Sequence, residues 1–183
     1  MNLDQNQKHE QKEEENSNEI DHSDEKNVTK ILKFEDFLSY MRTGLYMRKE
    51  TYTFENQMKY LFNGIDLDGL SYVTSRDAEF LLLCYYQKDY LNITKLFFCG
   101  ADKNRDRKIT IADISDSVNY LILRKMDKNK FEAKCRSEFG ENKKELEFYE
   151  FYKIITSKDI IENYDPYEGR IKEKSSSSCC ILI

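Results

Sequence analysis

The stretch that decides the fold is residues 102–113, which read Asp102-Lys103-Asn104-Arg105-Asp106-Arg107-Lys108-Ile109-Thr110-Ile111-Ala112-Asp113. Oxygen-bearing side chains stand at positions 1, 3, 5, 9 and 12 of this stretch, and an aliphatic side chain stands at position 8. A calcium ion takes about six to eight oxygen ligands, and one compact loop of about twelve residues can surround it. The spacing therefore predicts a cation-binding loop.

The pattern is repeated earlier in the chain. Residues 66–77 read Asp66-Leu67-Asp68-Gly69-Leu70-Ser71-Tyr72-Val73-Thr74-Ser75-Arg76-Asp77. Both stretches have Asp at positions 1 and 12, an aliphatic at position 8 and Thr at position 9, and Phe62 and Phe98 stand four residues ahead of them. Two matched units are stronger evidence than one motif. Over about residues 28–160 the chain resembles the EF-hand superfamily of calcium-binding proteins.

Two fainter copies flank these loops, at residues 32–37 and 146–151, and each looks like the end of a loop running into a helix. The implied loops are residues 25–36, 66–77, 102–113 and 139–150, numbered one to four below. In the family that the chain resembles, loops pair through a short antiparallel bridge at position 8. Leu32 (or Ile31) would then face Val73. In the second pair, Ile109 would face Leu146.

The resemblance implies that loop three binds Ca²⁺, with Mg²⁺ as an alternative ion at the same place. The implied ligands are the side chains of Asp102, Asn104, Asp106 and Asp113 and the main-chain carbonyl of Lys108. Three features weaken binding. Arg107 stands at position 6, where a sharp turn favours Gly, the position-12 residue is Asp rather than the longer Glu, and four basic residues lie within the loop. We therefore expect micromolar or weaker affinity for calcium.

The other loops have incomplete ligand sets. Loop two has Leu70 at position 5, so its metal site would be a weak one made of Asp66, Asp68 and Asp77. Loop four is short, which leaves two alternatives. Either it has lost four residues after Phe139, or Cys135 takes the place of the leading Phe and Phe139 stands at position 1. No ligand set remains in either register.

The predicted fold class is all-α, with four EF-hand-like helix–loop–helix units in two paired lobes and short antiparallel bridges between paired loops. Apolar residues at helical spacing support it, for example Phe54, Met58, Leu61 and Phe62, or Ile114, Val118, Leu121 and Ile122. We expect an acidic disordered tail at 1–27, a degenerate N-terminal pair at 28–87, and a C-terminal pair at 88–163. In the latter, the hand at 102–113 is intact and the hand at 139–150 is degenerate. A flexible tail with a lipidation motif is expected at 164–183.

The chain ends with Cys180-Ile181-Leu182-Ile183, which resembles a prenylation box. One lipid holds a protein only weakly on a membrane, so a second signal is expected, and acylation of Cys179 is the candidate. No apolar run approaches the roughly 20 residues of a membrane span, and the N-terminus has no signal-peptide pattern. The expected location is peripheral, on the cytoplasmic face of a membrane, or cytoplasmic without lipidation.

These features favour a calcium-binding regulatory or adaptor protein, tethered to a membrane by lipid, that binds a target protein helix in response to calcium. The alternative is a constitutive subunit of the light-chain or calcineurin-B type, without a calcium switch. An enzyme is not expected, because no nucleophile–base pair, phosphate-binding Gly loop or His ligand set is present. Nucleic-acid binding is disfavoured by the net charge of −5 and by the lack of a long basic stripe.

Overall fold

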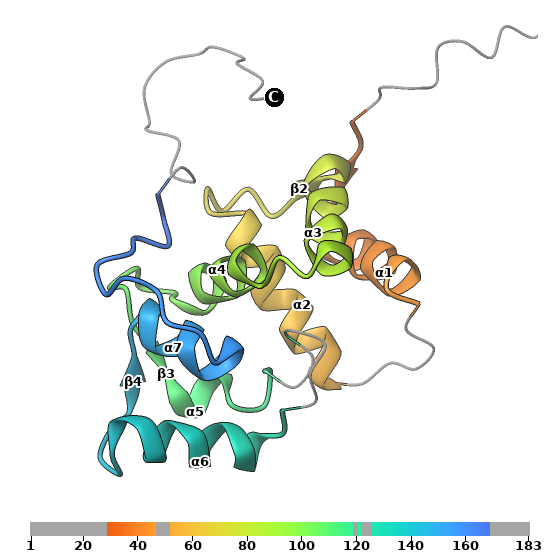
Figure 1. Ribbon diagram of the computed structural model, residues 1–183. Helices are drawn as coiled ribbons and strands as arrows, with labels where there is room; N and C mark the ends of the chain where they lie inside the picture. The colour runs from red at the N-terminus through yellow and green to blue at the C-terminus, as the bar shows by residue number, and fades with distance from the viewer. Residues whose placement is uncertain (1–28, 47–51, 119–120, 122–125, 169–183) are drawn as a thin grey trace, which may run out of the picture.

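The computed structural model describes residues 29–46, 52–118, 121 and 126–168, and shows a mostly helical protein with two small antiparallel sheets (Figure 1). Its elements in chain order are β1 (Ile31–Leu32), α1 (Phe34–Gly44), α2 (Tyr52–Ile65), β2 (Val73–Thr74), α3 (Ser75–Gln87), α4 (Tyr90–Ala101), β3 (Ile109–Thr110), α5 (Ile111–Ile114), α6 (Lys128–Phe139), β4 (Glu145–Leu146) and α7 (Phe148–Thr156). The predicted acidic tail, residues 1–27, lies outside the described residues.

The two sheets confirm the predicted strand pairings. Strand β1 pairs with β2 in antiparallel register, with Leu32 opposite Val73, so Leu32 rather than Ile31 takes this place. Strand β3 pairs with β4 in the same way, with Ile109 opposite Leu146. Val73, Ile109 and Leu146 are all buried, because the aliphatic side chain of each loop points into the core.

The apolar stripes form the core, but one of them does not form the expected helix. In α2 the side chains of Phe54, Met58 and Leu61 are buried, as their helical spacing predicts. By contrast, α5 ends at Ile114, residues 115–117 form a turn, and Leu121 also lies in a turn, while Ile122 lies outside the described residues. The buried Ser115 hydroxyl donates to the carbonyl of Ala112. Such local bonds compete with the helix ladder, which accounts for the early end of α5.

Helices α2 and α4 cross at two glycines, where their backbones touch. A Cβ on Gly64 would lie 1.8 Å from the carbonyl oxygen of Leu96, and a Cβ on Gly100 would lie 1.8 Å from that of Tyr60. Leu96 stands four residues before Gly100, and Tyr60 stands four residues before Gly64. The two helices therefore contact each other in nearly the same way at both glycines. The rings of Tyr60 and Phe97 pack beside it, 5.0 Å apart. Only glycine permits this approach.

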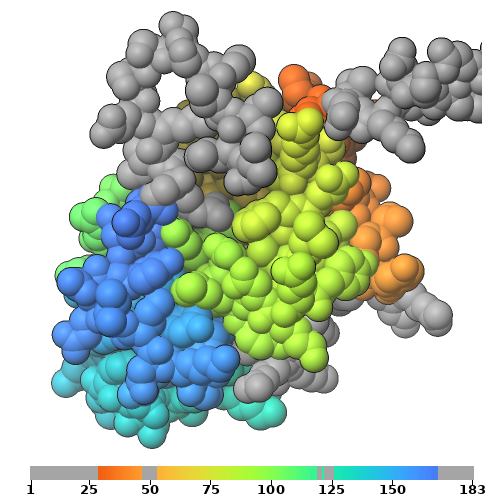
Figure 2. Space-filling model, turned by 45° about the horizontal axis from the view of Figure 1, so that its top comes forward, coloured from red at the N-terminus to blue at the C-terminus, as the bar shows by residue number. Residues whose placement is uncertain are grey.

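This crossing joins the two predicted lobes into one body. A single buried cluster includes Phe37 and Met41 from residues 28–87 and Phe131 and Ile155 from residues 88–163. Figure 1 shows α1 and α3 on one side of the crossing and α6 and α7 on the other, and Figure 2 shows their surfaces meeting without a break. The pairing of loops was predicted correctly, but the paired lobes share one core.

Candidate metal centre

Loops two and three turn the chain in the same way. Positions 4 and 6 have positive φ in both loops: 70° at Gly69 and 64° at Ser71, 59° at Arg105 and 66° at Arg107. The sharp turn predicted at position 6 is therefore present, and an arginine makes it. A non-glycine residue in this left-handed region costs on the order of 1 kcal/mol, so loop three carries strain at two positions.

The first aspartate of each loop caps this turn. In loop two, the carboxylate of Asp66 accepts hydrogen bonds from the backbone N–H groups of Leu70 and Ser71, both at 2.8 Å. In loop three, Asp102 accepts from Asp106 N–H at 3.2 Å and from Arg107 N–H at 2.9 Å. The matched bonds show that the two sequence repeats fold alike locally.

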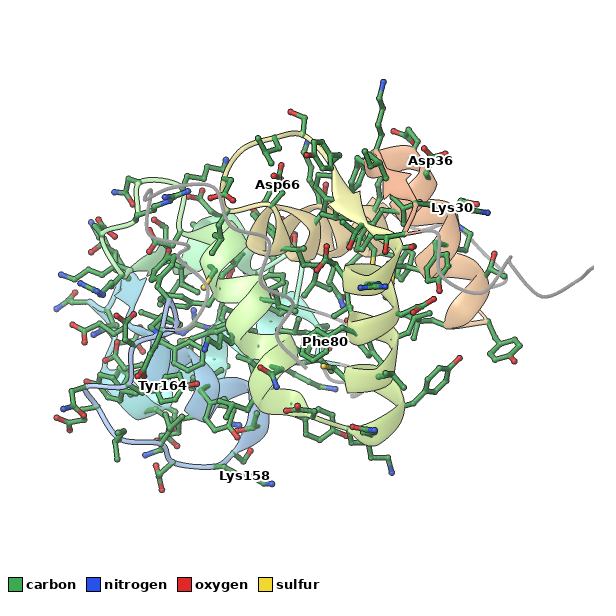
Figure 3. All side chains as sticks on the ribbon, turned by 90° about the horizontal axis from the view of Figure 1, so that it is seen from above. Lys30, Asp36, Asp66, Phe80, Lys158 and Tyr164 are labelled. Atoms are coloured by element: carbon green, nitrogen blue, oxygen red, sulfur yellow. The ribbon has the colours of Figure 1, made fainter. Side chains whose placement is uncertain are left out.

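The surroundings of the two aspartates differ. Asp66, at the end of α2 (Figure 3), is half-buried. Asp102 is only 2% exposed. A buried carboxylate needs several donors, and Asp102 therefore requires a partner from outside its own loop.

Four of the five predicted ligands of loop three line one small cavity of about 200 Å³. They are Asn104, Asp106, Lys108 and Asp113. Asp102, at the start of the loop, is not among the residues that line this cavity. The donors are carboxylate, amide and carbonyl oxygens, which are the ligands that a hard divalent cation prefers, so the chemistry of the set fits Ca²⁺ or Mg²⁺.

The carboxylates are not gathered around one point. Within the described ranges, no group of three or more His, Cys, Asp or Glu side chains is placed to hold a metal ion. Asp106 is engaged inside its own loop, because it accepts hydrogen bonds from the Asn104 amide at 2.8 Å and from Lys108 N–H at 2.9 Å. Binding a cation would require Asp106 to give up one or both of these hydrogen bonds.

Position 12 distinguishes loop three from loops two and four. Asp77 in loop two forms a capping box with Thr74, whose hydroxyl lies 2.6 Å from the carboxylate. Glu150 in loop four forms a capping box with Glu147. In loop three, Thr110 makes no side-chain cap hydrogen bond, and Asp113 is exposed at the cavity. A carboxylate that does not cap its helix remains available as a ligand.

The predicted weak site of loop two is not assembled. Asp66 is occupied by N–H groups of its own loop, Asp77 is occupied by the capping box, and Asp68 is exposed to solvent. Asp66 therefore serves the turn, and Asp77 serves the start of α3.

In loop four the position-12 carboxylate, that of Glu150, forms an ion pair with Lys143. Nζ of Lys143 lies 2.6 Å from Oε1 of Glu150, whose side chain is only 5% exposed. The structure also decides between the two alternatives for loop four. Cys135 is buried in the core at the place of the leading Phe, and α6 ends at Phe139, so Phe139 stands at position 1. Burial raises the pKa of the Cys135 thiol to about 11, so this cysteine packs as a neutral core residue.

Two of the four basic residues of loop three bind groups outside the loop, and the other two line the cavity. Arg105 donates to the carbonyl oxygen of Leu67 in loop two, and Arg107 forms an ion pair with Asp165 at 3.0 Å. Lys103 and Lys108 line the cavity. Two of the four positive charges are therefore held away from the candidate cation position, and two remain beside it.

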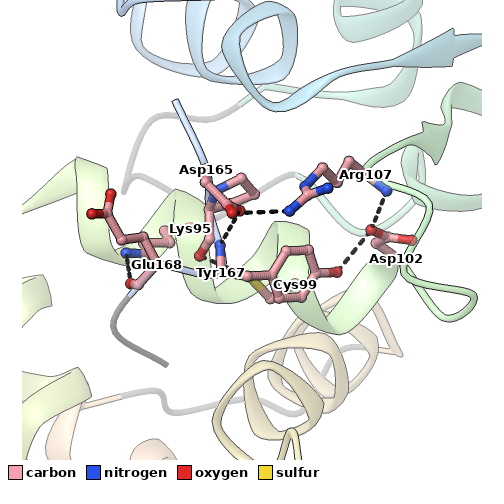
Figure 4. Close-up of polar contacts among 8 residues, drawn as sticks. Lys95, Cys99, Asp102, Arg107, Asp165, Tyr167 and Glu168 are labelled. Atoms are coloured by element: carbon pink, nitrogen blue, oxygen red, sulfur yellow. Dashed lines mark hydrogen bonds and ion pairs between the residues drawn. The ribbon is translucent and has the colours of Figure 1, made fainter. Parts of the chain in front are cut away.

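The sequence did not predict a second set of residues around loop three, which follows α7 in the chain. Residues 164–168, here called the C-terminal strap, were expected to belong to a flexible tail. Instead they pack on α4 and loop three (Figure 4), and Tyr167 is only 4% exposed. The Tyr167 hydroxyl donates to Oδ2 of Asp102 at 2.7 Å. Tyr164 and Tyr167 around Pro166 are the signal that could have indicated this packing, since they offer apolar area in a polar segment.

The ionisation states of the strap suit these contacts. Burial raises the pKa of Tyr167, and the hydrogen bond to Asp102 raises it further, so the hydroxyl stays protonated and donates. Burial would raise the pKa of Asp165, but the backbone N–H of Tyr167 and the Arg107 guanidinium outweigh burial and lower it. At neutral pH the strap therefore presents one neutral donor and one carboxylate to loop three.

The lipidation candidates Cys179 and Cys180 lie outside the described residues. Comparison of the chain with protein-family models, with curated proteins and with solved structures gives no significant match.

Proposed function

We propose that the protein is a calcium-binding regulatory or adaptor protein built from four EF-hand-like units, in which loop three is the responsive site. The observation that carries this proposal is the cavity lined by Asn104, Asp106, Lys108 and Asp113, the residues at positions 3, 5, 7 and 12. Asp113 lies within the four-residue helix α5 (Ile111–Ile114), so recruiting its carboxylate into the loop would move that helix. A bound Ca²⁺ would supply the charge that offsets repulsion among Asp102, Asp106 and Asp113.

The same structure indicates weak binding. Lys103 and Lys108 line the cavity and oppose a cation there. Asp113 is one methylene shorter than Glu, which makes a two-oxygen contact harder. We expect calcium affinity in the micromolar range or weaker, with magnesium competing for the same residues.

Replacing Asp113 with alanine should weaken calcium binding by at least about tenfold, because a hard cation depends on its carboxylate ligands. The fold should be kept, since Asp113 is exposed and caps no helix. Calorimetric titration of calcium and magnesium measures the change. The matched control is Asp116→Ala, which removes an exposed carboxylate that pairs with Lys128 at 3.4 Å. Equal calcium affinity in wild type and Asp113→Ala, or no binding by wild type at millimolar calcium, would remove loop three as the site.

A constitutive subunit is the second candidate, and one observation favours it. The position-12 carboxylates of loops two and four are already committed, Asp77 to a cap and Glu150 to a cap and to Lys143. Of these three loops, which all lie within the described residues, loop three alone is then left to respond to calcium. A protein of this kind would hold a target protein helix with or without calcium, whereas the adaptor would bind that helix more tightly with calcium.

The membrane tether is a further part of the proposal and depends on Cys180. Among the described residues, no helix is both long and apolar enough to cross a bilayer. If the terminal box is prenylated, Cys180→Ser should abolish membrane association, while Cys179→Ser should leave weak, exchanging association, because one lipid gives only marginal binding. Fractionation of cells that express the two variants measures this. A Cys180→Ser protein that stays in the membrane fraction would contradict the tether.

A further inference from the structure

The C-terminal strap is fixed at four points to the helix and loop that form the candidate metal centre (Figure 4). Two contacts reach loop three: the Tyr167 hydroxyl to Asp102, and Asp165 to Arg107. Two more reach α4, where Nζ of Lys95 donates to the Glu168 carbonyl oxygen at 3.0 Å and Sγ of Cys99 donates to that of Pro166 at 3.3 Å. The strap thus lies directly behind the base of the loop.

The first contact divides the two oxygens of Asp102. Oδ2 accepts both the Tyr167 O–H and the Arg107 N–H, and Figure 4 shows these two bonds on the same oxygen. From the described part of the chain, Oδ1 accepts a single bond, the longer one of 3.2 Å from Asp106 N–H. A carboxylate oxygen has two lone-pair sites. Among the described residues, one donor of the strap and one donor of the loop itself therefore fill Oδ2, while Oδ1 keeps one lone pair unused.

The second contact controls a charge. Arg107 stands at position 6, inside a loop that must accept a cation. Its guanidinium is drawn to Asp165 on the strap, and Arg107 is not among the residues that line the cavity. Without Asp165, the guanidinium would be free to lie over the loop, where its charge would oppose a second cation.

We propose that Tyr167 and Asp165 are positioning residues of the loop-three cation site, so that docking of the strap and binding of the cation reinforce each other. Tyr167 holds Asp102 with one oxygen left to serve as a ligand, and Asp165 holds Arg107 away. Coupling of this kind is reciprocal, since a group that favours the bound state is itself favoured by binding. The inference rests on the proposed function of loop three.

The test is calorimetric titration with calcium chloride on the full chain. Tyr167→Phe should weaken binding about tenfold, the lower end of the effect of partners that orient metal ligands. Asp165→Asn should weaken it about threefold, in line with an exposed ion pair. The control is Tyr164→Phe, which keeps the ring stacked on Phe148 in the same strap and should leave the affinity unchanged.

Hydrogen exchange supplies a readout that a purely structural strap would not change. Calcium should slow exchange of the backbone amides of Asp165, Tyr167 and Glu168 in wild type, and this effect should be lost in Tyr167→Phe. Normal calcium binding by Tyr167→Phe, or tighter binding, would overturn the positioning role while leaving loop three as the site. A wild type that binds no calcium would overturn the proposed function itself, and with it the role of the strap.

Discussion

Replacing Gly100 with alanine will lower the free energy of unfolding by about 3 kcal/mol or more. The added Cβ would lie 1.8 Å from the carbonyl oxygen of Tyr60 and 2.7 Å from the backbone nitrogen of Gly64. Backbone atoms within a helix cannot rotate away, so α2 and α4 must separate and their packed side chains lose contact. The better helix propensity of alanine returns only about 1 kcal/mol. Urea unfolding measures the change, and the melting temperature should fall by about 6–12 °C.

Two further variants test whether the crossing is the cause. Gly64→Ala should have an effect of similar size, because its Cβ would meet Leu96 in the same way. Gly69→Ala is the control, since Gly69 has φ of 70° but no atom within 4 Å of an added Cβ. It should cost on the order of 1 kcal/mol, from the left-handed backbone alone. If Gly100→Ala and Gly69→Ala lose the same stability, the close helix contact is not what makes Gly100 necessary.

Replacing Lys143 with methionine should be the second most damaging change, at about 2–3 kcal/mol. The Glu150 carboxylate is nearly enclosed, and the Lys143 ammonium 2.6 Å away is its charge partner. Methionine keeps most of the side-chain volume but leaves this buried charge unpaired, and an unpaired buried charge is costly. The Lys143 side chain is 32% exposed, so solvent reduces the loss below that of a fully buried pair. Chemical denaturation at neutral pH measures it.

The cause can be isolated with the double variant Lys143→Met, Glu150→Gln. Removing both charges should recover most of the lost stability, because the glutamine oxygen can still accept the Glu147 N–H that Glu150 accepts at 2.9 Å. Lys153→Met is the matched control, as Lys153 pairs with Glu138 at 3.4 Å on the surface, and its stability should stay close to wild type. A double variant no more stable than Lys143→Met would show that packing of the lysine stem, rather than its charge, is what matters.

The repeated loops made part of the fold predictable. The repeat aligned Val73 with Ile109, the fainter copies offered Leu32 (or Ile31) and Leu146 as their partners, and the family resemblance implied antiparallel pairing at these positions. The strained turn at Arg107 was predictable for the same reason. The register of loop four was not, because Cys135 and Phe139 are both apolar, and only their depth in the core separates the two alternatives.

Features that depend on contacts between distant segments were missed. The strap lies far from loop three in the sequence, and its polar neighbours suggested a flexible chain, whereas Tyr167 reaches a buried carboxylate. The helix crossing did leave a trace, since Gly64 and Gly100 each stand two residues before the first Asp of a loop. A glycine in that place is equally typical of a helix near its end. The sequence alone therefore did not indicate that the two helices cross at these glycines.

The backbone contact between α2 and α4 also fixes how the molecule can deform. Side chains at an ordinary interface change rotamers and absorb small displacements, but at Gly64 and Gly100 there are no side chains to do so. The energy of this contact rises steeply with any sliding or tilting, which makes the crossing a stiff joint rather than a hinge. A strain that begins at loop three is therefore passed on to α2 rather than absorbed at the crossing.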